Sequence, residues 1–282
     1  MTKMAQLNQV KIKTGNLLSS DDFKRKVILI PSVEVKLFDS TLNYMTNQCV
    51  DQYLNQQLLE GLKLTVEEWK GIGSDILQED GKGTIESTTL KYSIDPETRS
   101  GLKVSVKIFT YTESCSVFTD ALQTVMKSLG VDFIDSLTIS LPPSRTKGSI
   151  EEMKSIWKCA VKNVANGRIK DLGVSDLNAD QLKELYAWAD DIKPSTNQVN
   201  LDACCVIPPE LNDFAKDKQI RLLTHNDPRD ILPKDHLTSI LRDANLPDPE
   251  TWSPLWAGRY SVLVTGNGVI EAKGYIVSLV RT

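Results

Sequence analysis

The chain has 282 residues, of which 40% are hydrophobic and 25% are charged, and its formal net charge is −4. This balance is typical of a globular protein and excludes the strongly basic surface of proteins that bind nucleic acids or anionic membranes. The apolar runs are too short for a transmembrane helix, and the first residues lack the apolar core of a signal peptide.

The few cysteines and histidines bound the chemistry further. Five cysteines, an odd number without regular spacing, favour reduced thiols over structural disulfides. Two histidines leave little room for a zinc site. We therefore expect a cytoplasmic protein without a bound metal, which contacts neither nucleic acid nor membrane.

The first hundred residues carry weak patterns. Residues 10–14 alternate like a strand and stop at the turn signal Gly15-Asn16. Residues 27–38 contain short segments that read as strands or edge pieces. Residues 41–68 are polar and loosely helical, and the glycine-rich, acidic stretch 71–83 predicts a loop.

From residue 103 onward, short strands alternate with amphipathic helices. Strands are expected at 103–109, 136–141, 171–174, 196–199 and 221–224. Apolar stripes predict helices over 118–129, 153–164, 182–189 and 211–215. Gly130 and Gly167 read as helix C-caps, while Ser149 with Glu152 and Asn178 with Gln181 read as N-terminal caps.

Repeated strand–helix units at this spacing predict an α/β fold with a parallel sheet, either doubly wound or closed into a (β/α)8 barrel. No Gly-x-Gly-x-x-Gly follows any expected strand, so we favour a single-domain barrel. Function in such a barrel gathers where the strands end. Those ends are Ser140, Ser175-Asp176, Gln198 to Asn200 and His225-Asn226.

Several of these strand ends resemble the aldo-keto reductase family. Leu129 to Asp135 is similar to its L-G-x-D-Y-I-D, Gly167 to Asp176 to its G-K-x-x-x-I-G-V-S-N, and Gln198 to Asn200 to its Q-V-E/N. The resemblance implies a (β/α)8 barrel, NADPH as cofactor, and a catalytic tetrad of Tyr, Lys, His and Asp.

The departures from that family concern its chemistry. Ser140 occupies the place of the tetrad histidine, and Asp176 replaces the asparagine that would lie beside the nicotinamide amide. The phosphate-binding I-P-K-S stretch would align with residues 262–266, which lack its lysine. Lys107 falls where the family lysine would be, although a lysine at a strand end is usually solvated. Asp39 and Tyr44 have the spacing of the family's Asp and Tyr, which is frequent by chance.

A closer resemblance is to the regulatory (modifier) subunits of glutamate–cysteine ligase. It rests on five stretches: residues 11–18, Gln198 to Pro209 with Cys204-Cys205-Val, Leu222 to Pro228, Arg259-Tyr-Ser-Val, and residues 270–276. It covers the chain from Lys103 to the C-terminus together with residues 11–18, whereas 19–102 align poorly.

This resemblance implies a non-catalytic barrel that binds the catalytic subunit of the ligase as a heterodimer. The regulatory subunit would improve glutamate affinity and relieve feedback inhibition by glutathione in glutathione biosynthesis, with a link to oxidative stress. The alternative is an active NADPH-dependent carbonyl reductase. The broken tetrad favours the regulator, because a tyrosine is a poor acid without its lysine and histidine neighbours.

The candidate site residues each have two interpretations. Ser175 and Gln198 either keep a weak, vestigial hold on the nicotinamide of NADPH or satisfy backbone groups at strand ends. His225, with Asn226 and Asp227, is either structural or part of a partner surface. Cys204 and Cys205 are either two small loop side chains or a redox-responsive contact that forms an intersubunit disulfide. The stretch 247–256, rich in proline and tryptophan, either binds a partner or packs onto the barrel.

Overall fold

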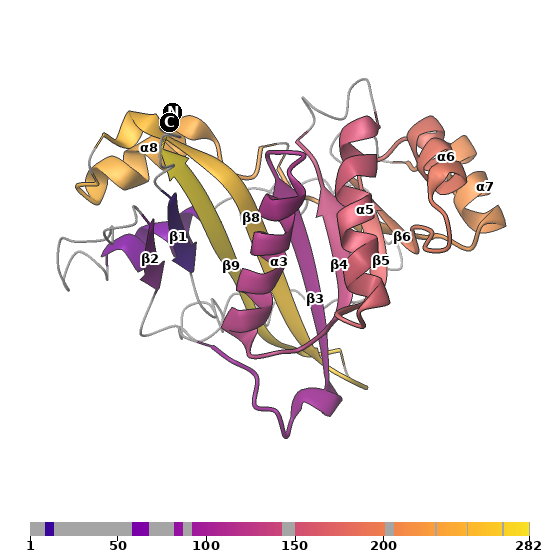
Figure 1. Cartoon of the computed structure of the whole chain (residues 1–282), viewed down its shortest axis with the longest axis horizontal. Helices are drawn as coiled ribbons and strands as arrows, with labels where there is room; N and C mark the ends of the chain where they lie inside the picture. The colour runs from indigo at the N-terminus through magenta and orange to yellow at the C-terminus, as the bar shows by residue number, and fades with distance from the viewer. Residues whose placement is uncertain are drawn as a thin grey trace, which may run out of the picture.

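The described strands join into one mixed sheet in the computed structural model of the chain (Figure 1), in the order β2-β1-β9-β8-β3-β4-β5-β6-β7. The structure describes residues 9–13, 58–67, 82–86, 92–142, 150–200, 206–228, 230–246, 248–266 and 268–281. None of the helices in these ranges is both long and apolar enough to cross a membrane.

One half of the sheet is parallel and built from strand–helix units. Its strands are β3 (Leu102–Thr110), β4 (Ile134–Ser140), β5 (Ile169–Ser175), β6 (Thr196–Asn200) and β7 (Arg221–His225). The helices between them are α3 (Cys115–Leu129), α5 (Glu151–Ala165), α6 (Ala179–Trp188) and α7 (Pro209–Asp217). Each of these elements overlaps a segment predicted from the sequence, which confirms the α/β class.

Most of the expected helix ends are confirmed as well. Gly130 ends α3 with a left-handed φ of 68°, which glycine adopts without the steric cost of a side chain. Asn178 and Gln181 form a reciprocal capping box at the start of α6. The expected cap at Ser149 lies outside the described residues, and α5 begins at Glu151 without a side-chain cap from Ile150.

The other half of the sheet is mostly antiparallel. β8 (Trp252–Val264) and β9 (Ile270–Arg281) form a long hairpin, β8 pairs with β3, and β9 pairs with β1 (Gln9–Lys13). β2 (Lys82–Glu86) runs parallel to β1, so the loop predicted over 71–83 is wrong at its last two residues. Two short 3-10 helices, η1 (Arg99–Gly101) and η2 (Pro249–Thr251), precede β3 and β8.

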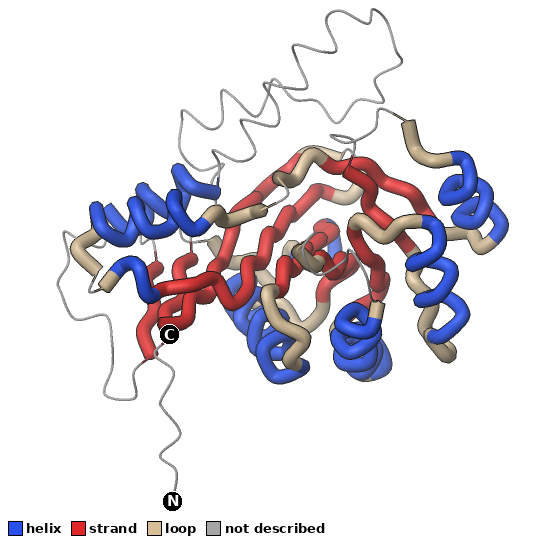
Figure 2. The backbone as a smooth tube through the Cα atoms, turned by 90° about the horizontal axis from the view of Figure 1, so that it is seen from above, coloured by secondary structure: helices blue, strands red, loops and turns tan. Residues whose placement is uncertain are grey.

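This hairpin adds an antiparallel part to the predicted parallel sheet. Parallel neighbours need a crossover between them, whereas β8 and β9 follow one another in the chain and pair antiparallel. In the described part of the chain the sheet is therefore open, with β2 and β7 as its edges. Figure 2 shows it as a strongly curved layer.

Apolar side chains cover the sheet on two faces. On one face, Val104, Val106 and Ile108 of β3 pack with α3, α5, α6 and α7 in a single core. On the opposite face, the β8–β9 hairpin packs against α8 (Lys234–Asp243) and the helical residues 58–67. Trp252 and Trp256 are 1% and 0% exposed, so these two residues of the 247–256 stretch pack onto the sheet.

Two cysteines correct the expectation of reduced thiols. Cys115 at the start of α3 and Cys159 in α5 form a disulfide, with their Cα atoms 5.7 Å apart. They are 44 residues apart in sequence, and only the packing of α3 against α5 brings them together. The count and spacing of cysteines carry no signal of that packing.

Candidate functional site

A buried ion pair links the first and last strands of the parallel half. Lys107 of β3 donates to Asp227 Oδ2 at 2.7 Å and to the Ser175 hydroxyl at 2.8 Å. The side chains of Lys107 and Asp227 are each 3% exposed, so the interpretation of Lys107 as a solvated lysine is wrong. Alternation along β3 explains its place: Val106 and Ile108 face the helices, and Lys107 therefore points to the other face of the sheet.

Asp227 is shared by a second cation. Both terminal nitrogens of Arg259, on β8, donate to the two carboxylate oxygens of Asp227 in a bidentate pair. Burial alone would raise the pKa of Asp227, but Arg259, with His225 and Lys107, holds it far below its ordinary value. For Arg259 the effects have the opposite sign: burial would lower its pKa, but Asp227 and Tyr275 outweigh burial and raise it.

His225 joins two carboxylates at the end of β7. Its Nε2 lies 3.0 Å from Asp176 Oδ1, and its Nδ1 lies 3.1 Å from Asp227 Oδ2. Burial would lower the pKa of His225, but hydrogen bonds to Asp176 and Asp227 outweigh it and raise the pKa above its ordinary value. The imidazole is thereby stabilised in its charged form.

Asp176 takes its position from an unusual backbone conformation. Its φ is 62°, in the left-handed region that aspartate tolerates better than most residues. Its carboxylate accepts from the Ser175 hydroxyl at 2.8 Å and from the Asn200 backbone N–H at 3.0 Å. Burial would raise the pKa of Asp176, yet the bond to His225 and the nearby charges lower it.

Burial acts on Lys107 as well. Desolvation, together with the nearby Arg259, lowers its pKa to about 8 against the opposing attraction of Asp227. The group thus combines two carboxylates with lowered pKa, an imidazole with raised pKa, an arginine and a lysine. Its members bond to one another across several strands, and this arrangement is suited to bracing strand ends.

The two residues predicted to hold a nicotinamide are neighbours in the sheet. Ser175 pairs in register with Gln198 on the adjacent strand. The Ser175 hydroxyl is 0% exposed and bonds within the network, and Gln198 Nε2 donates to Thr138 Oγ1 at 3.1 Å. Both side chains therefore bond to other side chains inside the protein, and a hold on a nicotinamide stays a prediction.

The remaining predicted residues fall into two sets. Ser140 is 5% exposed at the end of β4, and Asn226 is half-buried between His225 and Asp227. Cys204, Cys205, Asp39 and Tyr44 lie outside the described residues. Within the described ranges, no group of three or more His, Cys, Asp or Glu residues is placed to hold a metal ion.

Sequence reasoning missed the role of Arg259. It was identified only as part of a family motif, while its function in the network is to hold Asp227. A usable signal was present, because a single arginine interrupts the apolar alternation of residues 255–264. A charged residue in such a strand is rarely buried without an ionic partner.

The chain is similar to known proteins over nearly its whole length. The model of the aldo/keto reductase family matches residues 82–226. The glutamate–cysteine ligase regulatory subunits of Rattus norvegicus and Homo sapiens are each 34% identical to this chain, over 99% of its length and 95% of theirs. A crystal structure of an aldo-keto reductase from a Medee basin deep-sea metagenome library is 25% identical, with a TM-score of 0.36, over 43% of this chain and 42% of that chain.

Proposed function

We propose a regulatory function for this chain, which belongs to the glutamate–cysteine ligase regulatory subunits and, with them, to the aldo/keto reductase family. The carrying observation is similarity at 34% identity over nearly the whole of both chains. The function is that of a glutamate–cysteine ligase regulatory subunit in glutathione biosynthesis. Its partner is the catalytic subunit of the ligase, and its place is the cytoplasm.

The regulation is a coupling free energy between the two subunits. Binding of this chain favours the state of the catalytic subunit that has high glutamate affinity, and disfavours the state that binds glutathione. A coupling of about 1–3 kcal/mol changes an affinity roughly 5- to 150-fold.

The same chain lacks reductase chemistry in this proposal. Ser140 stands where the reductase family has its histidine, and a serine at this position is no proton donor near neutral pH. Lys107 is bonded to Asp227, so its charge is already compensated inside the protein. A reductase needs that lysine to lower the pKa of its tyrosine.

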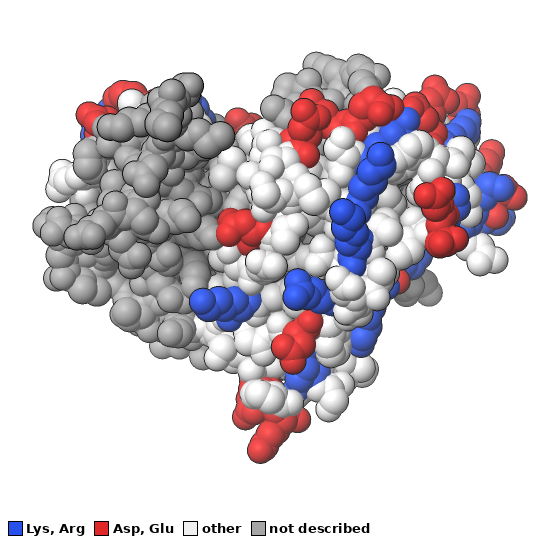
Figure 3. All heavy atoms as spheres, in the orientation of Figure 1, with Lys and Arg blue, Asp and Glu red and all other residues white. Residues whose placement is uncertain are grey.

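We assign the partner surface to the carboxyl end of the parallel strands, where Asn226 is half-buried and the buried His225 and Asp227 brace the backbone beneath it. Cys204 and Cys205 come shortly after β6 in the sequence and are the proposed redox contact. They lie outside the described residues. Figure 3 supports a polar surface at this end: Asp and Glu side chains gather along the edge where α3 and α5 begin. Glu151 and Glu152 in the first turn of α5 belong to it.

The test mixes the full chain with the purified catalytic subunit and measures its kinetics. We expect a lower KM for glutamate and a higher Ki for glutathione than for the catalytic subunit alone. An unchanged KM and Ki would overturn the proposal. Under oxidising conditions, Cys204→Ser with Cys205→Ser should remove a covalent heterodimer on a non-reducing gel, while Cys49→Ser serves as the matched control.

The competing function, an NADPH-dependent carbonyl reductase, has a direct test. The purified chain is incubated with NADPH and generic aldehydes, and absorbance at the nicotinamide band is followed. We expect no turnover above the rate without protein. Saturable NADPH oxidation that is lost in Lys107→Met would favour the reductase instead.

A further inference from the structure

The face of the sheet that carries Lys107 is polar across all of its parallel strands. One row of paired residues crosses it as Arg259, Lys107, Thr138, Gly173, Thr196 and Arg221. These residues stand opposite to the apolar face that packs against α3 and α5, because side chains alternate along each strand. An ordinary barrel fills this face with branched apolar side chains.

A cavity of about 220 Å³ lies against this row. Four cationic side chains line it: Lys103, Lys107, Arg221 and Arg259. No acidic residue belongs to its described lining. Behind the lining, Asp171 bonds to Arg221, and Asp227 bonds to both Lys107 and Arg259. These two carboxylates offset half of the positive charge. Two positive charges are left over, and the cavity is smaller than the roughly 300–1,000 Å³ of drug-sized ligand sites.

An unused donor points to the same conclusion. Thr196 is 4% exposed, lines the cavity, and its Oγ1 has no hydrogen-bond partner among the described residues. A buried hydroxyl without a partner costs about 1–3 kcal/mol, so such groups normally have one. Thr138 and several serines supply further hydroxyls in the same lining.

The cations around the cavity repel one another. Burial is the main cause that lowers the pKa of Lys107 and of Lys273 to about 8 in each case, and the charge of Arg259 contributes to both shifts. Lys273 of β9 pairs with Ser261, which lines the cavity. An anion between these groups would relieve the repulsion that their mutual proximity creates.

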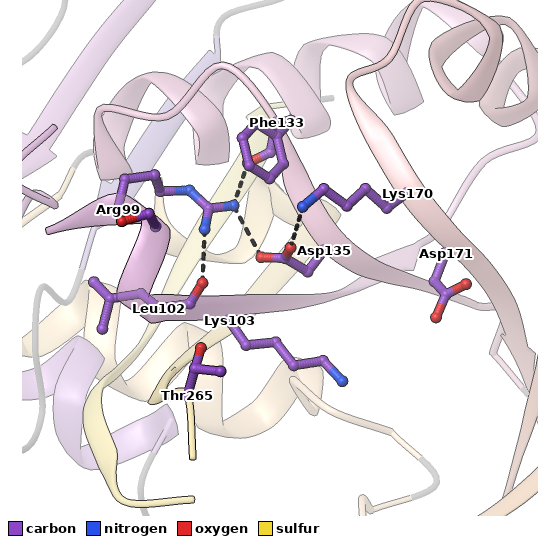
Figure 4. Close-up of a pocket in the computed structure, with 9 residues that line it drawn as sticks. Arg99, Leu102, Lys103, Phe133, Asp135, Lys170, Asp171 and Thr265 are labelled. Carbon is purple, nitrogen blue, oxygen red and sulfur yellow. Dashed lines mark hydrogen bonds and ion pairs between the residues drawn. The ribbon is translucent and has the colours of Figure 1, made fainter. Parts of the chain in front are cut away.

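The cavity extends toward the amino end of the parallel strands, where Lys103 and Arg221 lie. A second pocket of about 430 Å³ lies there, and Lys103 lines both. Figure 4 shows Asp135 bonded to both Arg99 and Lys170 in this pocket, while the Lys103 side chain extends away from them. Asp171 lines the outer pocket and bonds to Arg221 of the inner one at 2.6 Å.

We propose that this polar cavity binds a small dianion, a phosphate group or a dicarboxylate, between Lys103 and Arg221 on one side and Lys107 and Arg259 on the other. The Thr196 hydroxyl donates to it. The site shares Lys107 and Arg259 with the Asp227 network. It does not depend on the regulatory function, because it rests on the lining of the cavity alone.

The test is calorimetric titration of the full chain with sodium phosphate and, separately, with sodium succinate. Sodium chloride at equal ionic strength is the reference. We expect saturable binding of at least one dianion. Tighter phosphate binding identifies a compact oxyanion as the ligand, and tighter succinate binding identifies a dicarboxylate that spans the two pairs of cations.

Two variants locate the site. Lys103→Glu should weaken binding at least tenfold, whereas Lys216→Glu, the same charge change on an exposed residue of α7, should leave the dissociation constant within twofold. Thr196→Val keeps the side-chain shape and removes only the unpartnered hydroxyl. It should weaken binding several-fold without lowering the Tm of the ligand-free protein.

Two results would overturn the proposal. One is the absence of saturable heat with both dianions. The other is binding that Lys103→Glu and Lys216→Glu weaken equally, which would mean a general response to net charge. Neither result bears on the glutamate and glutathione kinetics, so the two proposals stand or fall separately.

Discussion

Lys107 and Asp227 form an ion pair at 2.7 Å although each side chain is only 3% exposed. They lie 120 residues apart in sequence, Lys107 in the middle of β3 and Asp227 two residues beyond the end of β7. Taking both charges out of water costs several kcal/mol each, and geometry and additional hydrogen bonds must offset that cost. Arg259, Ser175 and His225 provide those bonds, so the stability of the pair belongs to the whole network.

Removal of the central carboxylate should be strongly destabilising. Asp227→Asn leaves Lys107 and Arg259 as buried cations without a counter-charge, and we expect a loss of about 3–5 kcal/mol in the free energy of unfolding. Urea denaturation followed by circular dichroism measures it. Asp243→Asn, on the exposed side of α8, is the matched control and should change stability by less than about 0.5 kcal/mol. Equal midpoints for the two variants would show that the network does not stabilise the fold.

The two histidines allow a controlled test of pH dependence. The folded-state pKa of His225 is raised, so its contribution is fully present below the unfolded value of about 6.5 and is lost as pH rises through the folded pKa. The wild-type Tm should therefore fall more steeply than that of His225→Gln between pH 5.5 and 7.5. His236→Gln, at an exposed residue of α8, should keep the wild-type slope. A His225→Gln profile parallel to wild type would contradict the assigned charge state.

Asp135 ties three strands together at the amino end of the sheet. It accepts from Arg99 at 2.9 Å, from Lys170 at 2.9 Å and from the Val104 backbone N–H at 2.9 Å. Asp135→Asn should cost about 1–3 kcal/mol at pH 7, the range for hydrogen bonds to charged groups.

The pH dependence of this effect has a defined sign. Burial would raise the pKa of Asp135, but the hydrogen bonds outweigh it and lower the pKa. Its contribution is present above the unfolded value of about 3.9 and is lost as pH falls through the folded pKa. The urea midpoint of Asp135→Asn should thus lie closer to the wild-type midpoint at pH 3 than at pH 7. Asp132→Asn, exposed just before β4, is the control.

Gly173 sits where two strands approach each other closely. A Cβ built on Gly173 would lie 2.8 Å from the Thr196 carbonyl oxygen and 2.9 Å from Thr196 Cβ. Gly173→Ala should therefore cost about 1–3 kcal/mol through overpacking and should disturb the lining of the anion cavity. Gly101→Ala meets nothing within 4 Å and should be nearly neutral. Thermal unfolding of both variants measures the difference, and equal Tm values would contradict the close approach of Gly173 to Thr196.

Local patterns in the sequence determined the elements of the parallel half. Period-two alternation predicted the face of β3, and the Asn178–Gln181 spacing predicted the capping box of α6. Such signals depend only on residues a few positions apart, so they can be recognised in the sequence itself. The motif at residues 129–135 likewise indicated the aldo-keto reductase family, and the motif at residues 198–209 indicated the regulatory subunits.

Only the tertiary structure decided which distant residues meet. Lys107 reads as a solvated lysine in the sequence, but the residues that follow β7 bring Asp227 to it and make it a buried partner. The antiparallel hairpin, the Cys115–Cys159 pairing and the cationic cavity also depend on strand register and helix packing. These are long-range contacts whose free energy is gained only when the whole sheet forms, and no local pattern encodes them.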